Sequence, residues 1–293
     1  MSLSYTLRPG WAELPGGVRA AVENRAGSPV VSSASAVGGF TPGMAATLRL
    51  GTGDEVFVKA VGPGHPGITE MMNAERRINA VLPAMVPAPA LLWSLSCEEW
   101  TVLGFEAVVG RHPELSPASS DTGQVLGVLE TLSSTPCPDG VQDAPTRFTG
   151  WRDSGAWPER AAELAWWEER CSMAGGTLVH ADLRADNMLL GGGRRVLVVD
   201  WAAAVRGAAW VDPAYVCAQL VMSGWEPAQA ERLMGALPAW KEAEPEQITA
   251  FAVGLCGIWE ASTAREQSPG LREYRSRAAV AGRAWISYRL GWS

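Results

Sequence analysis

The spacing of apolar residues changes about one third of the way along the chain, and this change constrains the fold more than any other feature. Before residue 108, apolar residues occur in short runs separated by Gly- and Pro-rich turns, which is typical of an antiparallel sheet. One stretch here, Ile68–Leu82, has helical spacing instead and is followed by prolines. The expected strands are Val30–Val37, Met44–Leu50, Val56–Val61, Ala90–Leu95 and Trp100–Val108.

After residue 108, apolar residues recur at helical spacing over most of the chain. The exception is a pair of short strands, 188–190 and 196–199, joined by a glycine-rich turn. The sequence therefore predicts an α+β, bilobal protein: residues 1–107 form a five-stranded antiparallel sheet with one helix, and residues 108–293 form a mostly helical lobe. The expected helices are Asp121–Leu132, Pro158–Met173, Pro213–Ser223, Pro227–Leu233, Pro245–Ser262 and Leu271–Leu290.

The charge of the chain excludes several kinds of partner. Its 293 residues include 24 basic and 31 acidic side chains, and the net charge of −7 argues against binding to nucleic acid or to an anionic membrane. The five cysteines form no Cys-x-x-Cys pair, and no apolar stretch is long enough to span a bilayer. We therefore expect a cytoplasmic protein with no membrane contact and no obligate protein partner.

The segment LVHADLRADNMLL places polar residues at a spacing that chance rarely produces. His180, Asp182 and Asn187 form the pattern His-x-Asp-x-x-x-x-Asn, and Asp200 ends the apolar run that follows. Given how few His and Asn residues the chain contains, the first pattern has a chance expectation on the order of one in a thousand. The segment is therefore the strongest candidate for a functional site.

The expected hairpin places Asn187 and Asp200 at the same end of two adjacent strands. Two oxygen ligands at such a position suit Mg²⁺, which prefers hard oxygen donors and keeps several waters when it binds nucleotide phosphates. Asp182, in the loop before them, is placed to accept the proton of an attacking hydroxyl. For Asp182 or Asn187 alone, a loop or helix-cap role is the better interpretation, but the combination with Asp200 favours chemistry.

These residues resemble the catalytic and metal-binding loops of the aminoglycoside phosphotransferase family, whose members are relatives of protein kinases. The resemblance extends to Lys59, to the lobe junction and to the segment around Asp212, so it spans most of the chain. It implies a protein-kinase-like bilobal fold that binds a nucleoside triphosphate and Mg²⁺ between its lobes and phosphorylates a hydroxyl of a small molecule. Asp182 is then the catalytic base, and Asn187 and Asp200 hold the metal.

Lys59 lies in an apolar strand, where alternation places it on the same face as Phe57 and Val61. A charge there needs a partner, and Glu70 and Glu75 on the following helix are the candidates. The resemblance favours Glu75 and implies that Lys59 holds the nucleotide phosphates. Only two of the 24 basic residues are lysines, so an ammonium at this position is conspicuous. The alternative is a lysine that extends from a sheet edge into solvent.

The resemblance also implies further contacts with the nucleotide. Gly39 lies in the turn GGFTPG, which is expected to cover the phosphates although its spacing differs from Gly-x-Gly-x-x-Gly. Phe105 is expected to line the base pocket, and the backbones of Glu106 and Val108 to bind a purine edge. Phe57 stands where protein kinases usually have a small Ala beside the adenine, so the choice between ATP and GTP stays open.

Other polar residues near the motif have expected supporting roles. Arg184 is expected to neutralise the transferring phosphate, with a solvated loop arginine as the alternative. Asp186 is expected to cap a backbone turn. The resemblance implies that His180 supports the catalytic loop through hydrogen bonds and that Asp212 braces it from the next helix.

We expect a small-molecule O-phosphotransferase that uses ATP, with GTP as the alternative, and Mg²⁺. Arg in place of Lys, with abundant Ala and Gly, suggests a high-GC bacterial genome, where such kinases often serve antibiotic resistance, so an antibiotic is the expected acceptor. One alternative is a metabolic kinase of a sugar, amino alcohol or nucleoside intermediate. A second alternative is a nucleotide-binding pseudokinase. It is disfavoured because the residues that the activity needs are all present: Lys59, Glu75, Asp182, Asn187 and Asp200.

Overall fold

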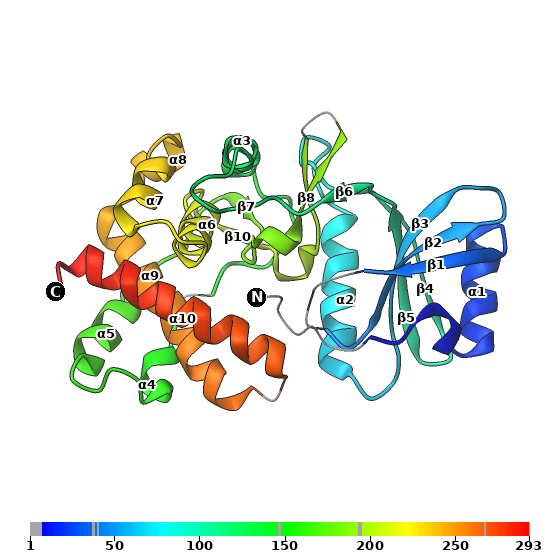
Figure 1. Ribbon diagram of the computed structural model, residues 1–293, viewed down its shortest axis with the longest axis horizontal. Coiled ribbons are helices and arrows are strands. Elements are labelled where there is room, and N and C mark those ends of the chain that lie inside the picture. Colours follow the sequence, from blue (N-terminus) through cyan, green and yellow to red (C-terminus); the bar gives the residue numbers. More distant parts are fainter. Residues whose placement is uncertain are drawn as a thin grey trace.

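The computed structural model describes residues 8–36, 39, 41–145, 148–192, 195–266 and 268–292. It shows a sheet-containing lobe beside a mostly helical lobe (Figure 1). The α+β fold class expected from the sequence is confirmed. Among the described residues, no helix combines the length and apolar character needed to cross a membrane.

Five antiparallel strands form the sheet of the first lobe in the order β1-β2-β3-β5-β4. They are β1 (Val30–Ser35), β2 (Met44–Leu50), β3 (Glu55–Val61), β4 (Leu91–Cys97) and β5 (Trp100–Glu106). The strands agree with the expected ranges to within two residues at the ends that the structure describes. Val37, Gly38 and Phe40, which belong to the expected first strand and the glycine-rich turn, lie outside the described residues.

Residues of β3 alternate between the two faces of the sheet, and each face is covered by a helix. Val56 and Val58 pack with the helix α1 (Gly16–Ala26), whereas Val61 packs with the helix α2 (Pro66–Asn79). Helix α2 lies on the side of the sheet that faces the second lobe (Figure 1). This alternation directs Lys59, which shares a face with Val61, toward α2 and the lobe junction.

Helix α1 corrects the expectation of a single helix in the first lobe. Its contact with the sheet is made by Val18 and Val22, which lie four residues apart and are fully buried. The rest of the helix is Gly, Ala, Arg, Glu and Asn, so its apolar stripe is too narrow to show as helical periodicity. The short 3-10 helix η1 (Trp11–Glu13) precedes it.

The second lobe is built from helices around one large core. Its helices are α3 (Thr122–Ser133), α4 (Gly150–Ser154), α5 (Ala161–Glu168), α6 (Val211–Met222), α7 (Pro227–Met234), α8 (Pro238–Lys241), α9 (Pro245–Arg265) and α10 (Pro269–Leu290). The expected helix Pro158–Met173 is shorter than predicted, because a turn at Trp157–Arg160 precedes α5 and the chain leaves the helix after Glu168.

Short strands hold the loops that face the first lobe. They are β6 (Gly110–Arg111), β7 (Thr177–Val179), β8 (Met188–Gly191), β9 (Val196–Val198) and β10 (Val205–Gly207), with the 3-10 helices η2 (Ala185–Asn187) and η4 (Trp201–Ala203). The expected hairpin is present as β8 and β9, and β6 pairs with β8. Strands β7 and β10 form a second pair that the sequence did not predict, because each has only three residues.

Candidate active site

A cavity of about 470 Å³ lies at the junction of the two lobes. The first lobe contributes residues of β2, β3, α2 and β5, and the second contributes the segments 186–189 and 199–202. The predicted site residues that line it are Gly39, Lys59, Glu75, Phe105, Glu106, Val108, Asn187 and Asp200. The structure therefore brings together residues that are up to 161 positions apart in the sequence.

Lys59 joins the two sides of this cavity. Its Nζ donates to both carboxylate oxygens of Glu75, at 2.7 and 2.9 Å, and to Oδ1 of Asp200 at 3.2 Å. Glu75 is almost fully buried on α2, whereas Glu70, the competing candidate, is exposed and pairs with Arg77. The structure places Glu75, not Glu70, next to Lys59.

Mutual attraction keeps Lys59 and Asp200 charged despite their burial. Burial alone would lower the pKa of Lys59, but Asp200 and Glu75 raise it above its usual value. Lys59 lowers the pKa of Asp200, so Asp200 stays a carboxylate. Burial raises the pKa of Glu75, although the charge of Lys59 opposes that rise. The cavity therefore presents an ammonium between two acids.

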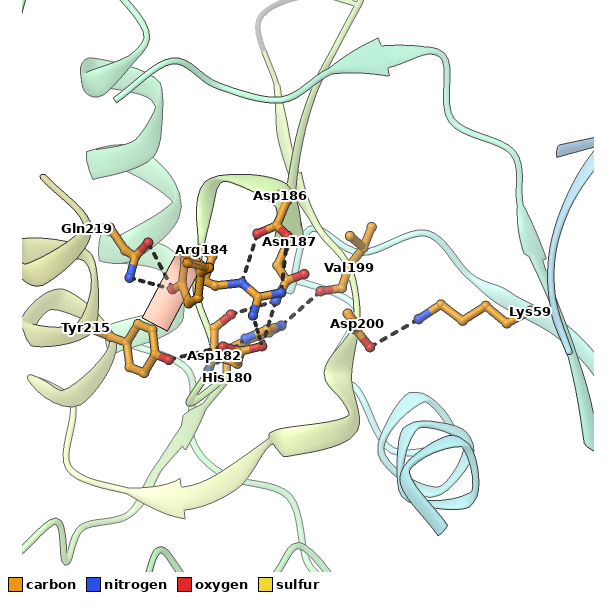
Figure 2. Close-up of polar contacts among 11 residues, drawn as sticks. Lys59, His180, Asp182, Arg184, Asp186, Asn187, Val199, Asp200, Tyr215 and Gln219 are labelled. Atoms are coloured by element: carbon orange, nitrogen blue, oxygen red, sulfur yellow. Dashed lines mark hydrogen bonds and ion pairs between the residues drawn. The ribbon is translucent and has the colours of Figure 1, made fainter. Parts of the chain in front are cut away.

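The catalytic-loop candidate Asp182 lies next to this cluster (Figure 2). Its Oδ2 accepts a hydrogen bond from Nδ2 of Asn187 at 3.1 Å, and its Oδ1 accepts one from the hydroxyl of Tyr215 at 3.1 Å. Nδ2 of Asn187 also donates to the backbone oxygen of Asp182 at 2.7 Å. These contacts hold the carboxylate in one orientation.

Asp182 differs from Asp200 in its proton affinity. Burial raises the pKa of Asp182 to about 6, with further increases from Asp200 and Asp186, while Arg184 and Tyr215 act in the opposite direction. A carboxylate with a pKa near 6 is ionised at neutral pH yet is a stronger base than an exposed aspartate. This is the proton affinity that a general base needs.

Arg184 forms an ion pair with each of two neighbouring acids. Its Nε and Nη2 donate to the carboxylate of Asp186 at 2.9 and 3.2 Å, and its Nη1 lies 3.5 Å from Oδ2 of Asp182. Its guanidinium also lies over the ring of Tyr274 on α10, 5.4 Å from the centroid. The alternative of a solvated loop arginine is therefore wrong, because the side chain is largely buried. Asp186, expected to cap a turn, instead accepts these bonds from Arg184.

The backbone of the loop is braced from α6 and β9. The carboxylate of Asp212 accepts hydrogen bonds from the amides of His180 and Ala181, at 2.8 and 3.0 Å. Ala181 has a φ of +62°, a conformation that non-glycine residues rarely adopt, so these two bonds offset local strain. His180 is buried, and Nε2 contacts the backbone oxygen of Val199 at 3.0 Å (Figure 2).

The hydrogen bonds of His180 define its protonation. Nδ1 accepts from the amide of Asp182 at 3.3 Å, so the ring proton is on Nε2 and is donated to Val199. Burial lowers the pKa of His180, which keeps the ring neutral. His180 therefore links the loop to Val199, the residue between β9 and Asp200, which is the supporting role expected from the sequence.

The donor set of Asn187 and Asp200 fits Mg²⁺. Both line the cavity, and Nδ2 of Asn187 is engaged with Asp182, which leaves its amide oxygen as the group available to a cation. Asp200 is ionised, and both ligands are hard oxygen donors. No group of three or more His, Cys, Asp or Glu side chains suited to a metal occurs in the described part of the chain. Phosphate oxygens and waters would have to complete the shell.

Phe105, Glu106 and Val108, the residues expected to meet a nucleotide base, all line the cavity. Phe57 and Phe105 face each other across the β3–β5 pair, and both line the cavity. The amide of Glu106 donates to the backbone oxygen of Ala90 at 3.0 Å. A purine edge would therefore have to use the carbonyl of Glu106, not its amide, together with the backbone of Val108.

Tyr215 is the contact of Asp182 that the sequence did not reveal. It lies on α6, three residues after Asp212, and the same helix thus supplies both the loop brace and a hydrogen bond to Asp182. The signal in the sequence was its position in the segment VDPAYV, one helical turn beyond an acid already assigned to the loop.

Two lobes around a lysine–glutamate pair, with Asp182 and Asn187 in a braced loop, define the protein-kinase-like class of phosphotransferases. The comparison with solved structures agrees, since the chain shares the fold of several small-molecule kinases. A sequence profile, APH, described as the phosphotransferase enzyme family, matches residues 43–245. The chain belongs to this phosphotransferase enzyme family. The expected family and the expected enzyme class, a phosphotransferase with a small-molecule alcohol acceptor, are thereby confirmed.

Three solved structures illustrate the similarity. A macrolide 2′-phosphotransferase from Brachybacterium faecium is 19% identical, has a TM-score of 0.53, and matches over 89% of this chain and 96% of that chain. The choline kinase of Streptococcus pneumoniae is 13% identical, with a TM-score of 0.61 and coverage of 90% and 98%. An amicoumacin kinase in complex with AMP-PNP and Ca²⁺ is 12% identical, with a TM-score of 0.54 and coverage of 93% of each chain. No curated protein sequence matches the chain significantly.

Proposed function

We propose that the protein transfers the γ-phosphoryl group of ATP, or of GTP as the alternative, to a hydroxyl group of an antibiotic. One observation carries the proposal: Lys59, Asn187 and Asp200 line a single cavity, and Asn187 hydrogen-bonds to the carboxylate of Asp182 beside it. In this proposal, residues 1–107 form the nucleotide-binding lobe and residues 108–293 form the catalytic and acceptor-binding lobe.

The nucleotide lies in the cavity between the lobes. Its base packs beside Phe105 and hydrogen-bonds to the backbone of Glu106 and Val108, all of which line the cavity. The turn at Gly39 covers the phosphates, and Lys59, held in place by Glu75, binds them. The structure of the amicoumacin kinase, which is similar in fold and 12% identical, contains AMP-PNP and Ca²⁺. This similarity supports a nucleotide and a divalent cation as the cofactors.

The transfer step uses Asp182 and Arg184. The acceptor hydroxyl gives its proton to the carboxylate of Asp182 as its oxygen bonds to the γ-phosphorus. The bond between that phosphorus and the β–γ bridging oxygen breaks, and ADP leaves with the electron pair. Arg184 neutralises charge on the transferring group. Asn187 and Asp200 would hold Mg²⁺, which would offset the negative charge of the phosphate oxygens.

The choice of acceptor rests on the similarity of this chain to kinases of known acceptors, and this similarity supports two candidates. The macrolide phosphotransferase and the amicoumacin kinase support an antibiotic acceptor. The choline kinase supports the second candidate, a metabolic kinase of an amino alcohol or another small metabolite. In either case the acceptor is a small molecule and the enzyme works in the cytoplasm without nucleic acid, membrane or obligate protein partner.

Replacement of Asp182 by asparagine tests the proposal. Mg·ATP and Mg·GTP are first titrated into the wild-type chain, and the Tm is expected to rise because the ligand binds the folded state. A screen of aminoglycosides, macrolides, amino alcohols and sugars then identifies the acceptor by its phosphorylation. Asp182→Asn is expected to lower kcat by about 10²- to 10⁴-fold and to preserve the nucleotide-induced rise in Tm, because only the general base is lost.

The matched control is Asp139→Asn, which changes a fully exposed carboxylate and is expected to leave kcat unchanged. A wild-type chain whose Tm responds to neither nucleotide would rule out the proposed function. Undiminished turnover by Asp182→Asn would remove Asp182 from the role of base.

A further inference from the structure

One charged residue of the cavity, Arg8, lies outside every motif described above. It precedes η1 and lines the cavity together with Gly39 and Thr41. Its Nε donates a hydrogen bond to the backbone oxygen of Thr41 at 3.2 Å. The side chain is therefore anchored to the turn that is expected to cover the nucleotide phosphates.

Most donors of this guanidinium have no partner among the described residues. An arginine side chain carries five N–H donors in a planar fork, and in the described ranges only Nε of Arg8 has a hydrogen-bond acceptor. The other four donors, on Nη1 and Nη2, belong to a half-buried group that lines the cavity. Such a fork fits two phosphate oxygens at once.

Gly39 makes room for the fork. A Cβ atom on Gly39 would lie 2.2 Å from Nη2 of Arg8 and 3.3 Å from its Cζ, so any larger residue would displace the guanidinium. Gly39 also has a φ of +75°, which glycine adopts without strain. The absence of a side chain at Gly39 therefore lets the guanidinium of Arg8 lie against this residue.

The charges around the cavity leave a need for a second cation. The acidic residues that line it are Glu75, Glu106, Asp186 and Asp200. Among its described lining residues, Arg8 and Lys59 are the only Lys or Arg, and Lys59 is already engaged by two carboxylates. A nucleoside triphosphate adds several negative charges, which an uncommitted guanidinium is suited to offset.

The position of Arg8 along the cavity indicates which part of the nucleotide it meets. Arg8 lines the same cavity as Asp186 and Asp200. Burial lowers the pKa of Arg8 and the charges of these two acids oppose that change, so the guanidinium stays protonated. Asp200 is the proposed metal ligand, at the phosphate end. Phe105 and Val108 mark the opposite, base-binding end.

We propose that Arg8 is a nucleotide-binding residue whose guanidinium donates hydrogen bonds to the phosphate chain of a nucleoside triphosphate. The inference rests on the proposed function, because it requires that the cavity bind a nucleotide. It extends that function by adding a phosphate contact from the N-terminal segment, outside the motif-bearing loops of the second lobe.

Calorimetric titration of ATP with Mg²⁺, and of adenosine, into three chains tests the inference. Arg8→Ala is expected to raise the Kd for ATP about tenfold through loss of charge-assisted hydrogen bonds, and to leave the Kd for adenosine unchanged. Arg8→Lys, which keeps the charge but not the fork, is expected to lose less affinity. Arg25→Ala, an exposed arginine on α1, is the matched control and is expected to bind both ligands as the wild type does.

Each other outcome is decisive. If the wild type binds ATP and Arg8→Ala binds it equally well or more tightly, the inference is wrong and the proposed function stands. Equal losses of ATP and adenosine affinity would assign Arg8 a structural role and likewise overturn the inference. A wild-type chain that binds no ATP would overturn the proposed function, and the role of Arg8 with it.

Discussion

The carboxylates of Asp182 and Asp200 show how neighbouring groups set the roles of two identical side chains. Burial raises the pKa of Asp182, whereas the adjacent charge of Lys59 lowers that of Asp200. Environments that shift the pKa values of two acids in opposite directions make one a proton acceptor and the other a permanently charged ligand. The two aspartates therefore suit the roles proposed for them, Asp182 as the base and Asp200 as the metal ligand.

Tyr215→Phe is expected to shift the pH dependence of turnover. The hydroxyl of Tyr215 stabilises the ionised form of Asp182, so its loss raises the pKa of Asp182 above about 6. Because the base must be ionised, kcat/KM should fall as pH drops through this pKa, and the variant should begin to fall at a higher pH. Above pH 8 the two profiles are expected to converge. Measurement of kcat/KM from pH 5 to pH 9 checks this.

The control for that experiment is Tyr288→Phe, which removes the hydroxyl of an exposed tyrosine on α10. Its profile should match the wild type. If Tyr215→Phe lowers activity equally at every pH, Tyr215 has a packing role only.

At the scale of elements, α9 and α10 determine what surrounds the catalytic loop. Helix α10 carries Tyr274, which lies against Arg184 and pairs with Gln219 of α6. The two helices approach closely at Gly282, where a Cβ atom would lie 2.7 Å from Sγ and 2.8 Å from Cβ of Cys256. Small residues at this crossing therefore set the distance of α10 from the site.

Gly282→Ala is expected to destabilise the protein by about 2 kcal/mol, because the added methyl overpacks the α9–α10 crossing. The matched change is Gly127→Ala on α3, where a Cβ atom meets nothing within 4 Å. It is expected to stabilise the protein by about 0.5–1 kcal/mol, because alanine has a higher helix propensity than glycine. Urea unfolding measures both. Equal effects of the two substitutions would show that the crossing tolerates a wider spacing.

At the scale of the whole molecule, Lys59 forms an ion-pair link between the lobes. It lies on β3, pairs with Glu75 on α2, and reaches Asp200, which lies between β9 and η4 in the other lobe. Helix α2 also packs against η4, the short helix that follows Asp200. The position of the first lobe relative to the catalytic loop is thus tied to the charge on one side chain.

Lys59→Met is expected to destabilise the protein by about 3 kcal/mol at neutral pH, because Glu75 stays buried without its partner charge. The pKa of Glu75 in the folded variant then rises further above its unfolded value. A raised folded pKa means that the variant loses stability as pH increases through that range and regains it in acid. Urea unfolding at pH 5 and pH 8 should show a larger loss at pH 8.

The double variant Lys59→Met/Glu75→Leu tests the cause of that loss. It removes the unpaired buried carboxylate, so it is expected to recover most of the stability at pH 8. A double variant as unstable as the single one would place the loss in side-chain packing instead.

The strands β2–β5 and the site residues of the loop were predictable because their patterns are local. Alternation in Val56–Val61 and the spacing from His180 to Asn187 each reside in one short segment. Helix α1 and the strands β7 and β10 were not predictable, because α1 has two apolar contacts and each strand has three residues. Such elements are stabilised by tertiary packing, not by their own periodicity.

By itself, the sequence determined the two-lobed α+β architecture, the family and the candidate site residues of the catalytic loop, since each is encoded in local spacing. The resemblance already favoured Glu75 over Glu70, and the structure adds its burial against Lys59. The hydrogen bond from Tyr215 and the presence of Arg8 in the cavity were decided only by the tertiary structure. The physical reason is that these contacts join segments far apart in the chain, and burial at the lobe junction sets their charges. Pattern along a chain indicates which groups are present, whereas folding sets their distances and proton affinities.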